Sequence, residues 1–315
     1  MKLFKSIAFF TILLFLFSCN STEEQKASPI NSKEKFATTA QSRTVSNQFK
    51  TYWYNGTAEI TSYKLKQERY GEIREGTAVN IFVTEDFLPN TQVKANSPSA
   101  ANISVLKLNQ MKNFNTGIYP YAIMTSTFNP IATQSHALKV SNSVQEWCGQ
   151  VYMQLNNRKK FEVVSHSYFE GEADQAFTLS KTYLENELWN LIRLNPEELP
   201  TGDIQLIPSF EYLRLKHQEI KAYNAFTSLK QGDSTTTYTI NYPALQRQLI
   251  LYFNSTFPYE IEKWEEVNAN SANNALQLKT TATKLKRIRS QYWSKNSNIH
   301  AVLRDTLNLN KEYHK

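Results

Sequence analysis

Residues 57–67 read TAEITSYKLKQ, and this stretch decides the fold class. Within it, Ile60 lies on one face of the chain if it is extended, whereas Tyr63 and Leu65 lie on the other. Successive side chains of a β-strand point to opposite faces, so an alternation of period two indicates a strand rather than a helix. The stretch therefore predicts a β-strand.

The same period recurs along most of the chain that follows. Predicted strands cover residues 77–84, 103–109, 118–128, 146–156, 161–169, 204–215, 220–229, 236–242, 247–253 and 259–267. Turn residues such as Gly71, Gly76 and Gly232-Asp233 separate many of them. Turn signals spaced by about 10 to 15 residues are typical of all-β folds. We therefore predict a mainly β fold: a large curved antiparallel sheet or barrel with one or two covering helices.

Two segments have helical spacing instead. Residues 181–193 place Tyr183, Leu184, Leu188, Leu191 and Ile192 on one face, after a possible N-cap at Ser180. The prolines that follow prevent the helix from continuing. A weaker helix is predicted over residues 299–309.

The N-terminus has the features of an export signal. Lys2 and Lys5 precede an apolar run from Ile7 to Phe17. This run of about 11 residues is too short to span a bilayer but suits the core of a secretory signal. We therefore expect a signal peptide over residues 1–18. Its ending, Leu-Phe-Ser-Cys19, resembles the lipobox of bacterial lipoproteins, which implies that Cys19 is acylated, for example with palmitate. The alternative is a plain signal peptide that is cut near the same place.

The segment after Cys19 is predicted to be a tether. Residues 19–48 are polar and have few large apolar side chains, so they cannot offset the entropy of ordering. Glu23 and Glu24 resemble the acidic export signal of surface lipoproteins in Bacteroidota. We expect residues 19–48 to be a lipidated, flexible tether and residues 49–315 to form a single β-rich domain.

The net charge of the chain excludes few classes of function. The formal net charge is +7, and part of it leaves with the signal peptide, so no nucleic-acid partner is expected. One basic cluster comprises Lys279, Lys284, Lys286, Arg287 and Arg289. It is interpreted as the solvated face of one strand or helix, or else as a contact for anionic lipid headgroups.

The strongest candidate for chemistry is a group of four residues: His166, Glu170, Glu172 and Asp174. In an extended strand all four lie on one face, so they are able to hold a divalent metal or to supply a general acid and base. The sequence Glu-Gly-Glu also indicates a turn, in which the same carboxylates are simply solvated. We favour the solvated turn and expect no metal and no cofactor.

Cys148 is the only cysteine besides Cys19. A nucleophilic thiol needs a base and a lowered pKa, and His136 and His166 are predicted on neighbouring strands. We favour a buried structural thiol over a nucleophile at this position.

Aromatic residues are abundant, with 17 Tyr, 18 Phe and 5 Trp. In a curved sheet they fill the concave side as a core, or they line a cavity for an apolar ligand. Two Asp-Ser/Thr-X sequences, at Ser234 and Thr306, resemble acceptors for O-glycans on exported Bacteroidota proteins.

Several phrases resemble an uncharacterised family of Bacteroidota lipoproteins. They are YWYNGTAEITSYKL (52–65), YGEIREGTAVNIFVTEDFLP (70–89), KNFNTGIYPYAIMTSTFNP (112–130), SVQEWCGQVYMQLNN (143–157) and SHSYFEGEAD (165–174). Some members of that family carry the label septum formation inhibitor Maf, which implies a nucleotide pyrophosphatase with an early Ser-Pro-Arg-Arg-type loop. This chain has no such loop, so a Maf-type pyrophosphatase is not expected. The strand pattern also resembles envelope carriers of the lipoprotein-chaperone type, at the level of the fold alone.

These features together predict a lipid-anchored cell-envelope protein at the outer membrane, facing either the periplasm or the surface. Its expected role is non-enzymatic: binding, carrying or scaffolding, with the membrane, an apolar ligand or other envelope proteins as partners. The alternative is an envelope hydrolase or metal-binding protein that uses the His166 group. A carrier is expected to have an apolar cavity between the sheet and the 181–193 helix, and a hydrolase a pocket where His166 meets two carboxylates.

The lipoprotein interpretation predicts the behaviour of a Cys19→Ser variant. Several acyl chains anchor a protein firmly, so the wild type should enter the detergent-rich phase of a detergent partition and the variant should not. Immunoblotting of both phases measures this. Recovery of both proteins in the aqueous phase would contradict acylation.

Overall fold

The computed structural model describes residues 41–268 and 278–309. These residues belong to one compact unit. The longer strands are β2 (Ala58–Arg69), β3 (Glu72–Leu88), β5 (Ile103–Thr116), β6 (Tyr119–Pro130), β8 (Lys139–Glu146), β9 (Gly149–Asn157), β10 (Phe161–Ser167), β11 (Gln175–Leu179), β13 (Gly202–Ile207), β14 (Tyr223–Lys230), β15 (Thr235–Tyr242), β16 (Arg247–Asn254), β17 (Ile261–Asn268) and β18 (Lys279–Ser290). Two-residue strands are β1 (Gln41–Ser42), β4 (Val93–Lys94), β7 (Thr133–Gln134) and β12 (Tyr183–Leu184).

The helices are few and short. They are α1 (Asn47–Trp53), α2 (Glu185–Leu194), α3 (Phe210–Leu215) and α4 (Val302–Thr306). Short 3-10 turns at Pro196–Glu198, Pro243–Leu245, Tyr292–Ser294 and Asn298–Ala301 complete the described elements.

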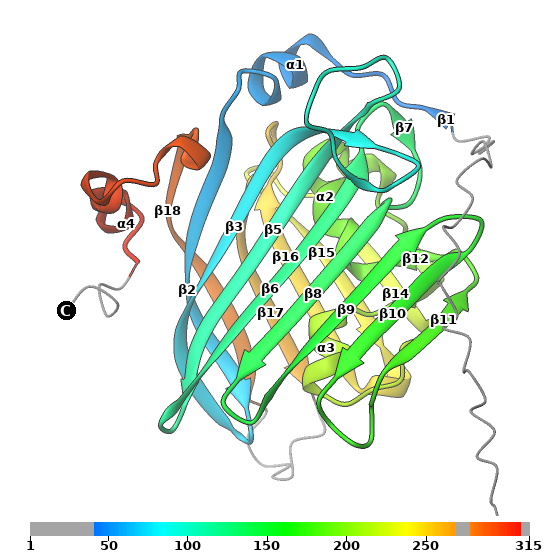
Figure 1. Cartoon of the computed structure of the whole chain (residues 1–315), viewed down its shortest axis with the longest axis vertical. Coiled ribbons are helices and arrows are strands. Elements are labelled where there is room, and N and C mark those ends of the chain that lie inside the picture. The colour runs from blue at the N-terminus through cyan, green and yellow to red at the C-terminus, as the bar shows by residue number, and fades with distance from the viewer. Residues whose placement is uncertain (1–40, 269–277, 310–315) are drawn as a thin grey trace, which may run out of the picture. The chain divides into compact units, whose positions relative to one another are not determined.

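One large sheet holds nearly all the strands. Along the sheet the order is β11-β10-β9-β8-β6-β5-β3-β2-β18-β17-β16-β15-β14-β13-β12, and β4 pairs with β3. Neighbours are antiparallel except for β12 and β13, which are parallel. The sheet does not close, because β11 and β12 are its two ends (Figure 1). The mainly β class and the curved antiparallel sheet predicted from the sequence are confirmed, in the open form rather than as a closed barrel.

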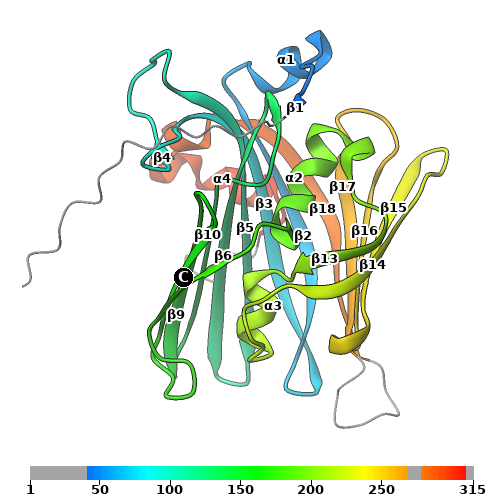
Figure 2. The same cartoon turned by 90° about the vertical axis from the view of Figure 1, so that its right-hand side faces the viewer.

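The sheet bends into two walls that face each other. One wall is built from β5, β6, β8, β9 and β10, and the other from β13 to β17. Figure 2 shows α2 and α3 between the walls, inside the concave side of the sheet. Each strand therefore buries the side chains that point inward, which explains the period of two in the sequence.

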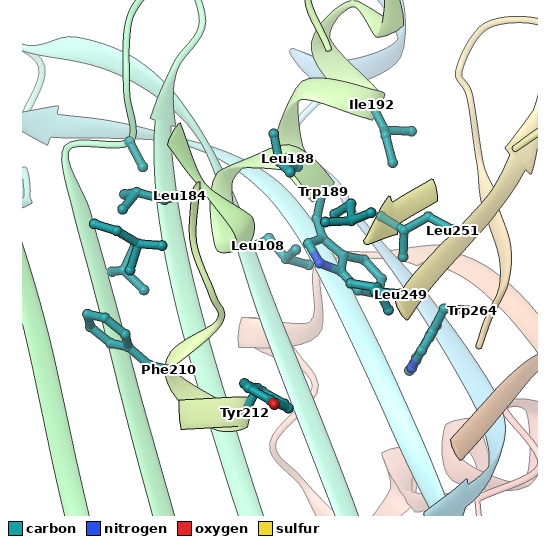
Figure 3. Packing of buried hydrophobic residues seen from close by; sticks show 14 of the residues in the cluster. Leu108, Leu184, Leu188, Trp189, Ile192, Phe210, Tyr212, Leu249, Leu251 and Trp264 are labelled. Carbon is teal, nitrogen blue, oxygen red and sulfur yellow. The ribbon is translucent and has the colours of Figure 1, made fainter. Parts of the chain in front are cut away.

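The apolar core lies on this concave side. Trp189 of α2 packs edge-on against Trp264 of β17, with ring centroids 5.2 Å apart. Figure 3 shows the two rings beside Leu249 and Leu251 of β16, with Leu108 of β5 nearby. A single cluster joins side chains from both walls and both interior helices. Removing this much apolar surface from water is the main favourable term in folding.

All ten residues of α2 are buried, including five polar ones. Arg193 makes a bidentate ion pair with Glu59 of β2, with N···O distances of 2.6 and 2.7 Å. Glu185 does the same with Arg247 of β16, at 2.5 and 2.8 Å. Asn190 donates to the carbonyl oxygen of Leu106 on β5 at 2.9 Å. Each polar side chain of the helix thus has at least one partner, on the sheet or on a neighbouring segment, as buried polar groups require.

The Glu59–Arg193 pair has an electrostatic consequence. Burial would raise the pKa of Glu59, but the Arg193 charge and its hydrogen bonds lower that pKa from 4.5 to about 2. A carboxylate with a lowered folded pKa contributes stability above its unfolded pKa, and that contribution is lost as the pH falls through about 2.

The predicted helix over residues 181–193 and the predicted strand over residues 204–215 need correction. Helix α2 begins at Glu185 rather than at Lys181, because Tyr183 and Leu184 pair with β13. The Glu187 carboxylate accepts a hydrogen bond from the Leu184 amide at 3.0 Å and caps the helix there, so Ser180 is not the N-cap. The predicted strand 204–215 ends at Ile207, and its second half is α3. Ser209 caps this helix by accepting a hydrogen bond from the Tyr212 amide at 3.3 Å.

Both ends of the domain also differ from expectation. Residues 41–48 belong to the folded chain: Arg43 is buried and pairs with Glu198 at 2.6 Å. The domain therefore begins at or before Gln41 rather than at residue 49, because β1 pairs with β7. The predicted helix over 299–309 is present only as a 3-10 turn followed by the short α4. The signal peptide, Cys19 and the first part of the tether lie outside the described residues.

The buried ion pairs predict an asymmetric mutational response. Arg193→Ala leaves the Glu59 charge uncompensated and should lower the free energy of unfolding by about 3–5 kcal/mol. The double variant Glu59→Gln/Arg193→Met removes both charges and should recover a large part of that loss. Urea unfolding of each variant at neutral pH measures the difference. Equal losses in the single and the double variant would contradict a charge-driven penalty.

Candidate functional site

The structure does not bring together the four predicted site residues, which are His166, Glu170, Glu172 and Asp174. His166 lies on β10, and its Nδ1 is 3.3 Å from a carboxylate oxygen of Asp174. Both side chains are largely exposed, at 62% and 73%. An exposed pair of this kind contributes little energy, since solvent screens it. These two residues line a shallow hollow of about 470 Å³ together with Tyr152 and Tyr168.

The side chain of Glu172 makes its contacts elsewhere and does not join His166 and Asp174. Its carboxylate accepts hydrogen bonds from Ser167 Oγ at 2.7 Å and from Arg214 Nη1 at 3.2 Å. The same carboxylate lies 2.8 Å from Nδ1 of His217. Glu170 is exposed at the tip of the turn. In the described ranges, no three His, Cys, Asp or Glu side chains gather as metal ligands would.

The cluster separates because residues 168–174 form a turn and not a strand. Ser165 pairs with Gln175, so the chain reverses between them. Ala173 has a φ of 49°, which redirects the backbone within the turn. Strand parity therefore does not apply beyond Ser167, and His166 does not meet two carboxylates as the hydrolase alternative requires.

A deeper cleft lies on the inner side of the same hairpin. It has a volume of about 470 Å³ between β9, β10 and β11 on one side and α3 with the segment after it on the other. We call it the edge cleft, because β11 is the last strand of the sheet. Its apolar part comprises Met153, Phe177, Leu179, Leu213 and Ile220. Its charged rim comprises Glu172, Arg214, His217, Glu219 and Lys221.

The topology of the sheet creates this cleft. The chain leaves β11 at Leu179 and reaches β12 at Tyr183, at the opposite end of the sheet order. It crosses the interior there instead of adding another strand beside β11. The inner face next to β11 therefore faces α3 and the segment after it rather than another sheet wall, and a cleft remains between them.

Arg214 is the central charged group of the edge cleft. Its side chain is only 5% exposed and lies over the ring of Phe169, with the guanidinium carbon 4.4 Å from the ring centroid. Glu172 and His217 contact its Nη1, whereas its Nε is buried without a hydrogen-bond partner. An unpaired buried donor is costly, so this group has unused capacity for an acceptor.

The space beside α2 is different in character. A cavity of about 40 Å³ lies there, with room for only a few water molecules. Glu185, Arg247 and Glu266 line it, and the two Arg247–Glu266 contacts are 3.1 and 3.3 Å long. Among residues 41–268 and 278–309, the space found beside this helix is therefore small and lined by charged residues, unlike the apolar cavity expected of a carrier. The hollow with an apolar floor lies at the sheet edge instead.

Cys148 is exposed, so the prediction of a buried thiol is wrong. It lies in the two-residue turn between β8 and β9, where neither face of the sheet covers it. A hydrogen bond from the thiol to Glu146 and the Glu146 charge raise the pKa of Cys148, which disfavours the thiolate that a nucleophile needs. His136 precedes β8 at its other end, and its Nδ1 lies 2.8 Å from Glu187.

The basic cluster lies on β18 and is largely paired with acids of β17. Lys279 contacts Glu265 at 2.7 Å, and Lys284 and Arg287 both contact Glu262. The five residues thus lie on one strand but not on one face of it, because the adjacent Lys286 and Arg287 point to opposite sides. Ser234 is exposed between β14 and β15, which leaves it accessible to modification. The Thr306 hydroxyl donates to the Val302 carbonyl oxygen at 3.3 Å, at the end of α4.

Comparison with known proteins does not assign a function. No family model matches this chain, and no curated protein and no solved structure matches it. Across residues 41–268 and 278–309, no helix combines the length and apolar character that a membrane span requires. The edge cleft is therefore the candidate site on its geometry alone.

Sequence reasoning missed Arg214 and His217 as site residues. Arg214 fell within the predicted strand over residues 204–215, and no role was predicted for His217. The available signal was Pro208-Ser209, because a proline followed by a capping serine favours a helix start.

The exposed position of Cys148 and its contact with Glu146 predict how fast the thiol reacts. Cys148 should react with iodoacetamide in the folded Cys19→Ser protein, but more slowly at neutral pH than an ordinary exposed thiol. Glu146→Gln removes the charge that raises its pKa and should accelerate the reaction. The rate as a function of pH, followed by mass spectrometry, measures this. Glu170→Gln, in the neighbouring turn, should leave the rate unchanged, and a thiol that reacts only after denaturation would contradict the exposed position.

Proposed function

We propose that this protein is a lipid-anchored protein of the cell envelope that binds and carries an amphiphilic small molecule without converting it chemically. In this proposal, Cys19 carries the acyl anchor at the outer membrane, and the chain is a Bacteroidota lipoprotein. The export signal in residues 1–18 supports the location. The edge cleft supports the binding role.

The observation that carries the proposal is the combination of an apolar floor with a charged rim. Small-molecule sites typically have volumes of about 300–1,000 Å³ and a mostly apolar lining with a few polar groups. The volume of the edge cleft, about 470 Å³, lies in this range, and the cleft joins a patch of apolar side chains to a larger polar and charged part. An acyl chain would cover Phe177 and Leu179, which are only half-buried at the sheet edge.

The rim favours a zwitterionic head group. Arg214 and Lys221 are cations and Glu172 and Glu219 are carboxylates, so both signs of charge face the same opening. The free Nε of Arg214 provides a donor for the anionic part of a head group. A single-chain zwitterionic lipid fits these features best.

The proposal is tested with lysophosphatidylethanolamine below its critical micelle concentration. Full-length mature Cys19→Ser protein should bind it with about 1:1 stoichiometry in isothermal titration calorimetry. Phe177→Asp places a charge in the apolar floor and should weaken binding by about tenfold or more, because burying an unpaired charge is unfavourable.

The matched control is Thr178→Asp. It places the same charge one residue away, on the other face of β11, and should leave the affinity unchanged. Equal binding by both variants, or no binding by the wild-type domain, would contradict the edge cleft as the site.

A further inference from the structure

Three hairpins, β2–β3, β5–β6 and β8–β9, end in uncharged two-residue turns with a large side chain exposed. The turns are Tyr70-Gly71 after β2, Gly117-Ile118 after β5 and Trp147-Cys148 after β8. Tyr70 is 61% exposed, Ile118 84% and Trp147 68%. Each turn therefore presents one apolar or aromatic side chain to solvent.

These turns lie at one end of the sheet. The end of β5 pairs with the start of β3, and the start of β6 pairs with the end of β8. The end of β10 pairs with the start of β9, so Tyr168, which follows β10 and is 74% exposed, lies at the same end. Figure 1 shows these turns together at the lower end of the wall. We call Tyr70, Ile118, Trp147 and Tyr168 the tip face.

Aromatic rings also pack around two of these four residues, Trp147 and Tyr168. The rings of Tyr119 and Trp147 have centroids 6.4 Å apart. The ring of Tyr168 lies directly over Gly149, where an added Cβ would be only 2.6 Å from a ring carbon. The absence of a side chain at Gly149 thus lets Tyr168 lie flat against β9, next to the Trp147 turn.

Folding does not require these side chains. Hairpin turns favour Gly, Asn and Asp, which accept the necessary dihedral angles, and apolar bulk at the tip buries nothing. The turn between β9 and β10, at the other end of the wall, is the basic sequence Arg158-Lys159-Lys160. Neighbouring exposed apolar side chains at one end of a protein usually mark an interaction surface.

We propose that the tip face docks onto the surface of a lipid bilayer. Tyr and Trp combine an apolar ring with a polar atom, and they are enriched where a membrane meets water. A row of separate turn tips suits a deformable lipid surface better than a groove-shaped partner. The surrounding exposed charges include the carboxylates of Glu72 and Asp174, so zwitterionic lipid is favoured over anionic lipid.

The chain length permits this orientation in an anchored protein. About 22 residues separate Cys19 from Gln41, and they reach at most about 75 Å when fully extended. The 14 residues of β5 span about 48 Å, so an anchor at Cys19 allows either end of the sheet to face the membrane. The edge cleft includes the turn that follows Tyr168, so docking would place the cleft close to lipid.

The experiment uses full-length mature chain with Cys19→Ser, so that no acyl anchor contributes. Flotation with phosphatidylcholine vesicles should recover the protein with the lipid, with little dependence on salt. An environment-sensitive dye on Cys148, next to Trp147, should shift to the blue when vesicles are added. The triple variant Ile118→Ser/Trp147→Ser/Tyr168→Ser should lower the partition coefficient by about tenfold or more.

The control is Trp293→Ser/Ile299→Ser/Val302→Ser, which removes three side chains of comparable exposure: 51%, 80% and 61%. They follow β18, whose last residue pairs with Ala58 at the other end of β2. This variant should bind vesicles like the parent. The proposal would be overturned if both triple variants lost vesicle binding equally, or if binding required anionic lipid. It would also be overturned if the tip face formed a dimer and did not bind vesicles. Phe177→Asp should still float, which separates this result from the proposed binding function.

Discussion

The buried polar face of α2 is the constraint on which the rest of the structure depends. A helix enclosed by a sheet loses all contact with water, so every polar side chain on it needs a partner. Arg193 finds Glu59 on β2, and Glu185 finds Arg247 on β16. Because these partners lie on different parts of the sheet, the helix fixes the distance between the walls as well as its own position.

Ion pairs of this kind do not maximise stability. Replacing a buried pair with apolar side chains of similar volume is often neutral or stabilising, whereas removing one partner is costly. What the pairs provide here is a defined orientation: a rotation of α2 by one residue would separate Glu185 from Arg247 and Arg193 from Glu59. We regard the register of the interior helix as the property that these charges fix. The same charges occupy the space beside α2, so a ligand of appreciable size must bind elsewhere.

The sequence predicts the strands, because they depend on a local alternation of side chains. It does not predict the features that depend on where the chain reverses direction. Strand periodicity identified β2, β3, β5 and most of the second wall, since one face of each strand is buried. It failed at Cys148 and at residues 168–174, where turns interrupt the strand and parity loses its meaning. It also failed at Ser180, because the pairing of β12 with β13 is a contact distant in sequence that no local capping pattern reveals. The edge cleft itself arises from the jump between β11 and β12 across the whole sheet, and strand spacing alone did not distinguish that topology from a closed barrel.

The proposed binding site lies at the open edge of the sheet, beside β11. An exposed edge strand offers unpaired backbone groups and invites aggregation, and proteins normally protect such an edge. Here β11 is short, at five residues, and Thr178 presents a polar side chain on its outer face. On its inner side, Phe177 and Leu179 still need a cover, and α3 supplies one only in part. Apolar surface remains between β11 and α3 because the chain crosses the interior after Leu179 instead of adding another strand beside β11. A fold in which ion pairs already occupy the space beside α2 therefore leaves room for a binding site at this edge, where the sheet ends before its core is fully enclosed.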